Sequence, residues 1–219
     1  MTRNRETTPP DALLLLAPGC AHCPAVLEGL SRLLKAGQLG RLEVVNVVAH
    51  PEAAAEAGTR SVPWCRIGPF ELEGAHTPAE LAQWTQHAAE GSGMSAYLSD
   101  LLESQRLPRV IELVDEAPRR LRDLVLLAGN LETPMAVRIG VGAVFEEFAG
   151  RAALAEVVPD LGALCRSADP QVRADACHYL GLSGAAEARP HVRGLLDDPD
   201  EEVREIAAES LAMLPGAET

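Results

Sequence analysis

The sequence lacks any long hydrophobic run, although 47% of its 219 residues are apolar. Its longest candidate, Ala12 to Ala17, has the length of a strand, whereas a helix that crosses a bilayer needs about 20 apolar residues. Residues 1–10 contain two arginines but no apolar stretch before a small-residue cleavage site, which is unlike a secretory signal. We therefore expect a cytoplasmic protein with no membrane partner, in which residues 1–10 form a flexible N-terminus.

Positive charge is also scarce, with 19 Lys and Arg residues against 32 Asp and Glu residues and a formal net charge of −13. Residues 1–90 carry 7 basic and 10 acidic side chains, and the rest of the chain carries 12 and 22, so the acidic surface belongs mainly to the C-terminal part. Because nucleic-acid affinity depends on clustered Lys and Arg, we expect no nucleic-acid partner. An acidic surface of this kind favours basic partners.

Cysteine is sparse, and its number, five, is odd, which argues against a secreted scaffold stapled by disulfides. Only Cys20 and Cys23 lie at the close spacing of a chemical motif. Cys165 and Cys177 fall on apolar helical faces and are expected to be core side chains. Cys65 is most simply a buried structural thiol.

Residues 11–90 alternate between strand-like and helix-like patterns. Apolar runs and period-two alternation predict strands, and apolar residues at three- and four-residue spacing, together with caps, predict helices. The predicted strands are 12–17, 42–48, 64–67 and 70–73, and the predicted helices are 24–36, 51–57 and 77–87. Because the first strand is apolar throughout, we expect it to be covered on both faces in a parallel sheet. A β-α-β unit is thus followed by a β-β-α unit that opens with a hairpin.

Gly91-Ser92-Gly93 is typical of a linker, and the chain beyond it has only helical periodicity. We assign 91–106 to a linker and a connecting helix, and 107–219 to helical repeats. Val-Arg recurs at 137–138, 172–173 and 203–204, which predicts helix pairs near 118–148, 151–182 and 186–213. The residues that precede a proline in each copy are predicted N-caps, namely Thr133, Asp169 and Asp198.

The segments ADPQVRADACHYLG and DDPDEEVREIAAESLA resemble the second helix of HEAT repeats, particularly the short form in bilin-lyase-like proteins. The resemblance covers about residues 107–214 and implies an all-α solenoid with a surface for partner proteins. In that family the positions matched by Asp169, Arg173 and Arg204 link neighbouring repeats, so these residues are expected to be structural.

The Cys20-Ala21-His22-Cys23 motif lies between a predicted strand and the first turn of a predicted helix, which is the setting of a dithiol redox site. A thiol there faces unpaired backbone N–H groups and the positive end of the helix dipole, so its thiolate is stabilised. We expect Cys20 to be the nucleophile and Cys23 to resolve the mixed disulfide. Two roles are open for His22, inside the motif: its imidazole either favours the Cys20 thiolate further and so tunes the pKa of Cys20, or it is a solvent-facing residue at the helix start.

APGCAHCP, residues 17–24, resembles the active-site turn of the thioredoxin family, and Ser61-Val62-Pro63 resembles the loop in which that family carries a cis-proline. The resemblance covers about residues 11–90 and implies a compact α/β thioredoxin-like domain with protein thiol-disulfide oxidoreductase activity. It further implies that Pro63 is cis and that Val62 pairs with an extended substrate segment. A cellular thiol reductant would recycle the dithiol, a HEAT-bound protein would be the client, and no resident cofactor is expected.

Two alternatives remain at this point. In the first, the chain is a protein-interaction scaffold whose thioredoxin-like domain is redox-silent. In the second, Cys20, Cys23 and Cys65 converge with His22 and carry a metal ion or an iron-sulfur cluster, for which thiolate and imidazole are suitable ligands.

Overall fold

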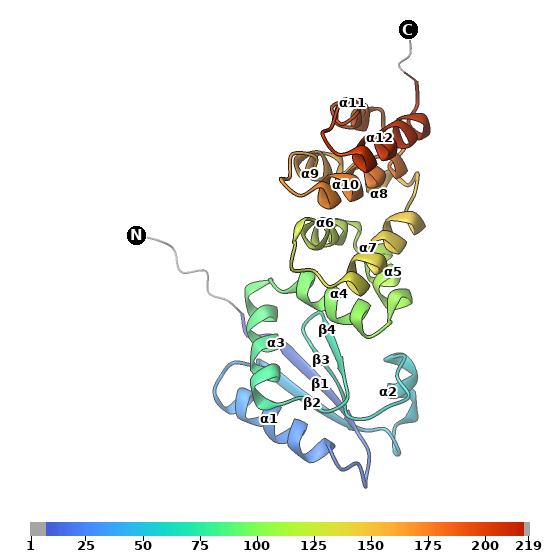
Figure 1. The fold of residues 1–219 in the computed structure, drawn as a ribbon. Coiled ribbons are helices and arrows are strands. Elements are labelled where there is room, and N and C mark those ends of the chain that lie inside the picture. The colour runs from blue at the N-terminus through green and yellow to red at the C-terminus, as the bar shows by residue number, and fades with distance from the viewer. Residues whose placement is uncertain (1–7, 217–219) are drawn as a thin grey trace. The chain divides into compact units, whose positions relative to one another are not determined.

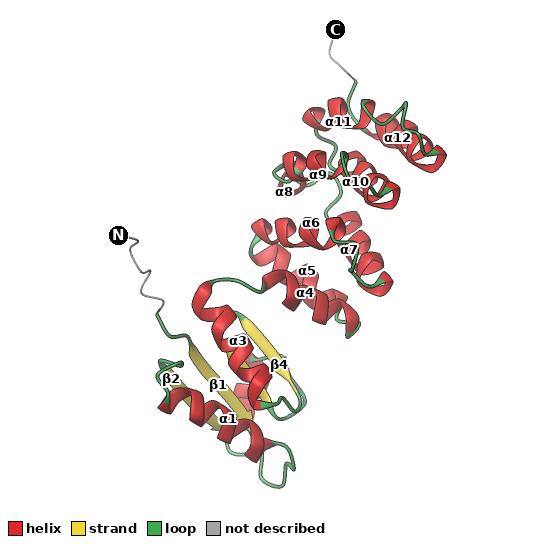
Figure 2. Cartoon of the chain, turned by 60° about the vertical axis from the view of Figure 1, so that its left-hand side comes forward, coloured by secondary structure: helices red, strands yellow, loops and turns green. Residues whose placement is uncertain are grey.

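The computed structural model describes residues 8–216, and the chain divides into two compact units, one ending at Gly93 and the other beginning at Met94. Within the described residues, the first unit is mixed α/β and the second is entirely helical (Figures 1 and 2). None of the helices between residues 8 and 216 combines the length and the apolarity of a membrane span. Most of the segment 1–10, expected to be flexible, lies outside the described residues, as does the end of the predicted repeat region.

The first unit is built on a four-stranded sheet in the order β2-β1-β3-β4. The strands, all four of them predicted, are β1 (Asp11–Leu16), β2 (Arg41–Asn46), β3 (Trp64–Ile67) and β4 (Phe70–Glu73). β2 runs parallel to β1, but β3 runs antiparallel to both β1 and β4. The predicted hairpin of β3 and β4 is therefore confirmed, and the expectation of parallel pairing is correct for β1 with β2 but wrong for β1 with β3. A two-residue connection at Gly68-Pro69 leaves room for an antiparallel partner and not for a crossover.

Two of the predicted helices lie side by side over one face of this sheet, α1 (Cys23–Lys35) and α3 (Pro78–Glu90) (Figure 1). They approach so closely at Gly29 that a Cβ on this residue would lie 2.7 Å from the Leu81 side chain. The third predicted helix, α2 (Pro51–Glu56), buries none of its residues. The sheet and the α1–α3 pair therefore enclose a core on one face. Leu14 and Leu15 are consecutive in β1, point to opposite faces and are both fully buried, so β1 is covered on both faces, as predicted.

The predicted start of α3 is confirmed in detail. The Glu80 N–H donates to Thr77 Oγ1 at 3.3 Å, and the Thr77 N–H donates to Glu80 Oε2 at 2.7 Å, which together form a capping box. The hydrogen bonds that the Glu80 carboxylate accepts from the Thr77 N–H and the Thr77 hydroxyl hold the pKa of this carboxyl below its usual value.

The second unit is a series of packed helices. The longer ones are α4 (Met94–Glu103), α5 (Leu107–Glu116), α6 (Leu121–Gly129), α7 (Met135–Glu147), α10 (Pro170–Leu182) and α12 (Glu201–Met213). The shorter ones are α8 (Ala152–Ala155), α9 (Val158–Leu164), α11 (Arg189–Arg193) and the 3-10 turns η1 (Pro118–Arg120) and η2 (Ala186–Ala188). The predicted pairs correspond to α6 with α7, α9 with α10, and α11 with α12. α4, in the segment expected to connect the units, packs against α6 and α7.

Of the three N-caps predicted in the repeats, one is correct. Asp169 accepts two backbone N–H bonds from the first turn of α10, at 2.9 and 3.2 Å, and so acts within its own repeat. Asp198 does not cap α12, because Asp200 does so with bonds of 3.0 and 3.3 Å. The 31-residue offset that aligns the two Val-Arg pairs also aligns Asp169 with Asp200. Thr133 likewise does not cap α7, since its hydroxyl donates to the Leu127 carbonyl at 2.7 Å.

Arginines at equivalent positions of the three repeats, Arg138, Arg173 and Arg204, each donate to a carbonyl of the loop before their own helix. Arg173 also donates to both carboxylate oxygens of Asp198, at 2.8 and 2.7 Å, and thereby joins α10 to the loop before α12. Arg138 joins α7 to α10 through Asp175 at 2.9 Å. The predicted linking role is thus confirmed for Arg173, whereas Arg204 acts within its own repeat.

Candidate redox site

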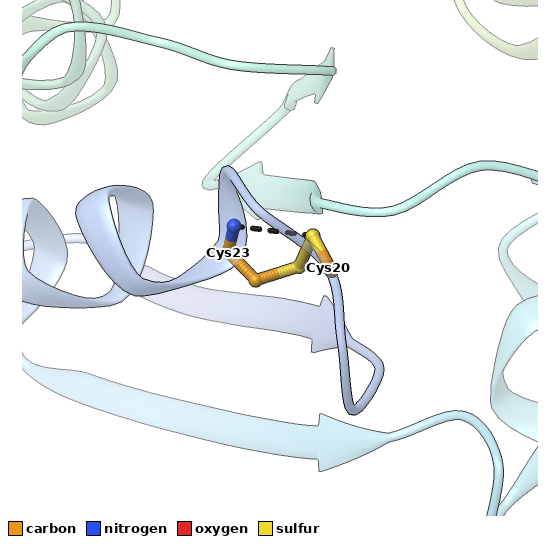
Figure 3. The surroundings of a disulfide bond; sticks show 2 residues. All are labelled: Cys20 and Cys23. Carbon is orange, nitrogen blue, oxygen red and sulfur yellow. Dashed lines mark hydrogen bonds between the residues drawn. A yellow bond between two sulfur atoms is a disulfide. The ribbon is translucent and has the colours of Figure 1, made fainter.

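The turn that carries the cysteine pair leads from the end of β1 into α1 (Figure 3). Gly19 has a φ of +80°, in the left-handed region that glycine adopts without strain, and the Cys20 N–H donates to the Ala17 carbonyl at 3.3 Å. This geometry brings the chain back toward the sheet within a few residues. Cys20 is half-buried, Cys23 is buried as the first residue of α1, and the two form a disulfide with their Cα atoms 5.5 Å apart.

The sulfur of Cys20 lies at the N-terminus of α1. The Cys23 N–H donates to Cys20 Sγ at 3.1 Å (Figure 3). The first turn of α1 contains no acidic residue, and its last turn contains Arg32 and Lys35. No carboxylate of this first turn therefore offsets the positive end of the helix dipole, and negative charge on Cys20 meets a backbone donor.

His22 occupies the N-cap position of α1, but its side chain makes no capping hydrogen bond. The imidazole is exposed and forms no hydrogen bond or ion pair within the described residues. Its expected influence on the Cys20 thiolate stays a prediction.

The sheet register places the Val62-Pro63 segment at the same sheet edge as the cysteine turn. Leu15, next to the end of β1, pairs with Trp64, the first residue of the antiparallel strand β3. Pro63 therefore precedes β3 at the edge from which the chain leaves β1 toward Cys20. The Val62-Pro63 peptide bond is cis, as predicted.

Val62 has unused backbone groups at this edge. The Pro63 carbonyl accepts the Gly74 N–H at 2.9 Å, but between residues 8 and 216 neither the N–H nor the carbonyl of Val62 has a hydrogen-bond partner. Val62 is half-exposed, so an extended peptide can reach these groups.

Cys65 is a buried thiol in β3 that is poorly suited to thiol-disulfide exchange. It lies in β3 between Leu14 of β1 and Leu72 of β4, and it is 1% exposed. Burial raises the pKa of its thiol to about 12, so the thiolate needed for nucleophilic attack is scarce at neutral pH. Cys165 and Cys177 are also buried, as predicted, and burial raises the pKa of each thiol as well.

Within the described part of the chain, no three His, Cys, Asp or Glu side chains gather as metal ligands. Cys20 and Cys23 are bonded to each other, and Cys65 is free in the core. The set of three thiolates that the metal or iron-sulfur alternative requires is therefore not assembled.

Introducing negative charge beside Cys20 tests the electrostatics of the turn. Ala25 is exposed in the first turn of α1, and Ala25→Glu is expected to slow alkylation of reduced Cys20 by iodoacetamide about two- to fivefold at neutral pH, because the carboxylate competes with the thiolate for the helix N-terminus. Ala25→Gln adds similar bulk without charge and is expected to leave the rate unchanged. Equal slowing by both variants would contradict the electrostatic account.

The second unit provides a match to a known family. Residues 136–217 match the family model of HEAT repeats. The matched range runs from α7 through α12, so the repeats that the Val-Arg periodicity predicts are confirmed there. No curated protein matches the chain. HEAT repeats commonly form surfaces for partner proteins, which supports an interaction scaffold in this part of the chain.

Some residues that hold these HEAT repeats together carried no usable signal in the sequence. Asp175 lies inside a helix without cap or repeat spacing, yet it accepts from Arg138 at 2.9 Å and from Gln171 at 2.8 Å. The role of Asp200 as the N-cap of α12, by contrast, could have been predicted from the 31-residue offset, which aligns Asp200 with Asp169.

Proposed function

We propose that the chain is a thiol-disulfide oxidoreductase in which a thioredoxin-like first unit performs the exchange and the HEAT repeats recruit a protein client. The observation that carries this proposal is the Cys20–Cys23 disulfide at the N-terminus of α1, with the Cys23 N–H on Cys20 Sγ at 3.1 Å. Cys20, the half-buried residue, has its sulfur at the helix N-terminus, and Cys23, the buried residue, is bonded to it.

The strand order supports the thioredoxin-like assignment. A parallel β1-α1-β2 unit is followed by antiparallel β3 and β4 and by α3, and the cysteine turn directly follows β1. This is the order that the resemblance of residues 11–90 implies. The β1 segment Leu13–Leu16 has no acidic side chain, so water or substrate rather than a buried carboxyl would take up the proton of Cys23.

In the proposed reaction the reduced protein donates two electrons to a client disulfide. The Cys20 thiolate attacks one client sulfur, a Cys20–client bond forms, and the other client sulfur leaves as a thiolate that takes up a proton. The Cys23 thiol then loses its proton and attacks Cys20 Sγ, which expels the second client thiolate. The protein is left with the Cys20–Cys23 disulfide, and a cellular dithiol or two monothiols reduce it again.

The Val62 segment would align the client during this attack. Its N–H and carbonyl are unused by the described residues, and they lie at the edge of the sheet where the cysteine turn begins. An extended client segment that pairs with them would hold its disulfide beside Cys20.

A trapping experiment tests the proposal. Cys23→Ser removes the resolving thiol, so Cys20 is expected to remain joined to a disulfide-containing protein such as insulin as a mixed disulfide that survives alkylation and is cleaved by dithiothreitol. The double variant Cys20→Ser/Cys23→Ser is the matched control and forms no adduct. An adduct of equal yield with the control, or none with Cys23→Ser, would contradict the proposal.

The HEAT match supports a second candidate function, a protein-interaction scaffold. The first unit would then be redox-silent. In that case the oxidised protein would not accept electrons from dithiothreitol or a thioredoxin reductase at a useful rate, while partner binding would be the same in the oxidised protein and in Cys20→Ser/Cys23→Ser.

A further inference from the structure

A groove of about 450 Å³ lies between α7 and α10 of the HEAT repeats. It is called the α7–α10 groove below, and its walls include Met135, Ile139 and Glu146 of α7 and Gln171, Asp175 and His178 of α10. Met135 and Ile139 are 68% and 67% exposed, which is unusual for two large apolar side chains one helical turn apart.

The packing of the neighbouring helices explains why the groove is open. α10 and α12 approach each other closely at Gly181, where a Cβ would lie 2.8 Å from the Ser210 Cβ. Between α7 and α10 the rings of Phe145 and Tyr179 stack instead, with centroids 4.3 Å apart and planes inclined by 7°. Two stacked aromatic rings occupy the interface that small residues occupy in the next repeat, so the face of α7 that carries Met135 and Ile139 is left uncovered.

The polar groups of the groove are unequally satisfied. Arg138 and Asp175 form an ion pair of 2.9 Å across it, and Gln171 donates to Asp175 at 2.8 Å, so these charges are already used. Glu146 is exposed and has no ion pair among the described residues. Burial and then the charge of Asp175 raise the pKa of the Tyr179 hydroxyl, Arg138 opposes them, and Glu146 raises this pKa further. Because Arg138 and Asp175 are paired, Glu146 adds a negative charge to the groove that no ion pair among the described residues offsets. The chain beyond residue 90 carries 12 basic and 22 acidic residues, so the wider field has the same sign.

We propose that the α7–α10 groove binds a short extended segment of the client that carries an aliphatic side chain beside a lysine or arginine. The aliphatic group covers Met135 and Ile139, which removes their apolar surface from water. The cation of the segment lies against Glu146, whose carboxylate has no ion pair among residues 8–216. The inference rests on the proposed function only in naming the occupant as the client of the dithiol.

Peptide binding tests the inference without redox chemistry. Three fluorescent peptides of about ten residues, lacking cysteine, combine leucine with lysine, leucine with glutamate, or serine with lysine, and their affinities are measured by fluorescence anisotropy. The leucine-lysine peptide is expected to bind the full chain at least about tenfold more tightly than either of the other two. Equal affinity for all three, or no binding of the leucine-lysine peptide, would overturn the proposal.

Substitutions then locate the binding. Ile139→Glu is expected to weaken the leucine-lysine peptide about tenfold to a hundredfold. Glu146→Lys should shift the preference toward the leucine-glutamate peptide. Leu126→Glu is the matched control, because Leu126 is 65% exposed on α6 and is not part of the groove wall. This variant should leave the affinity for the leucine-lysine peptide unchanged. Equal weakening by Ile139→Glu and Leu126→Glu would refute the assignment to this groove.

The same variants separate this inference from the proposed oxidoreductase. Ile139→Glu is expected to retain full reduction of a small aromatic disulfide, because the dithiol is untouched. Selective peptide binding together with a wild-type protein that reduces no disulfide would leave the groove established and refute the oxidoreductase. Disulfide reduction without selective peptide binding would refute the groove proposal and leave the oxidoreductase supported.

Discussion

Replacement of Cys20 by serine is expected to lower the rate of insulin disulfide reduction by at least about a thousandfold. The thiolate is the nucleophile of thiol-disulfide exchange, and a serine hydroxyl at the N-terminus of α1 is neither ionised nor able to form a disulfide. Turnover is measured with excess dithiothreitol by the turbidity of the released insulin chain, with the uncatalysed rate subtracted.

Cys65→Ala is the control for loss of a cysteine elsewhere in the first unit. Cys65 is buried in β3 with a thiol pKa raised to about 12, so its removal should leave turnover within about twofold of the wild type. Residual turnover of Cys20→Ser at a tenth of the wild-type rate or more would contradict a role for Cys20 as nucleophile, and a large loss in Cys65→Ala would implicate the third thiol.

The second large effect is expected on stability. Asp198 is buried between two repeats, accepts two hydrogen bonds from Arg173 at 2.8 and 2.7 Å, and accepts the Asp200 N–H at 3.0 Å. Asp198→Ala should lower the free energy of unfolding of the HEAT repeats by about 2 to 3 kcal/mol, because hydrogen bonds to charged groups are lost and the Arg173 guanidinium keeps only its two carbonyl partners.

The chain offers a readout that separates its two units. Both tryptophans, Trp64 and Trp84, lie in the first unit, so their fluorescence in urea reports its unfolding, while circular dichroism also follows the helical second unit. Asp198→Ala should lower the urea concentration at which the second unit unfolds, as followed by circular dichroism, and leave the fluorescence transition of the first unit unchanged. Asp160→Ala removes the exposed pair with Arg122 and is expected to cost less than about 1 kcal/mol. Equal costs for the two variants would refute the role assigned to Asp198.

Acid should remove the same stabilisation. The hydrogen bonds from Arg173 hold the pKa of the Asp198 carboxyl below its usual value, so the folded state favours the ionised form. The contribution is complete above the unfolded pKa of about 3.9 and is lost as pH falls through the lower folded pKa. The difference in unfolding free energy between the wild type and Asp198→Asn should therefore be constant near neutral pH and shrink below about pH 4.

Local signals in the sequence were sufficient for most elements of the first unit. Thr77-Pro78-Ala79-Glu80 predicts both the start of α3 and its capping box, because Thr77 and Glu80 exchange hydrogen bonds with each other without help from the rest of the chain. The strands at 64–67 and 70–73 follow from the Gly68-Pro69 turn that they flank and from the alternation of apolar and acidic residues in 70–73. Strand direction was not predictable to the same extent, since the antiparallel pairing of β3 with β1 depends on the path of a loop whose residues are compatible with either direction.

The sequence by itself determined two features, because both depend on spacing along the chain. One is the cysteine pair at a strand-to-helix turn in the candidate redox site, and the other is the repeat period of the helical unit. The tertiary structure confirmed the expectation that Cys65 is buried, and only it decided that Asp198 is a partner of Arg173 rather than a cap and that Phe145 and Tyr179 stack where α10 and α12 have glycine and serine. These outcomes depend on contacts between residues far apart in the chain, where side-chain volume and desolvation, not local backbone preference, determine which arrangement is most stable.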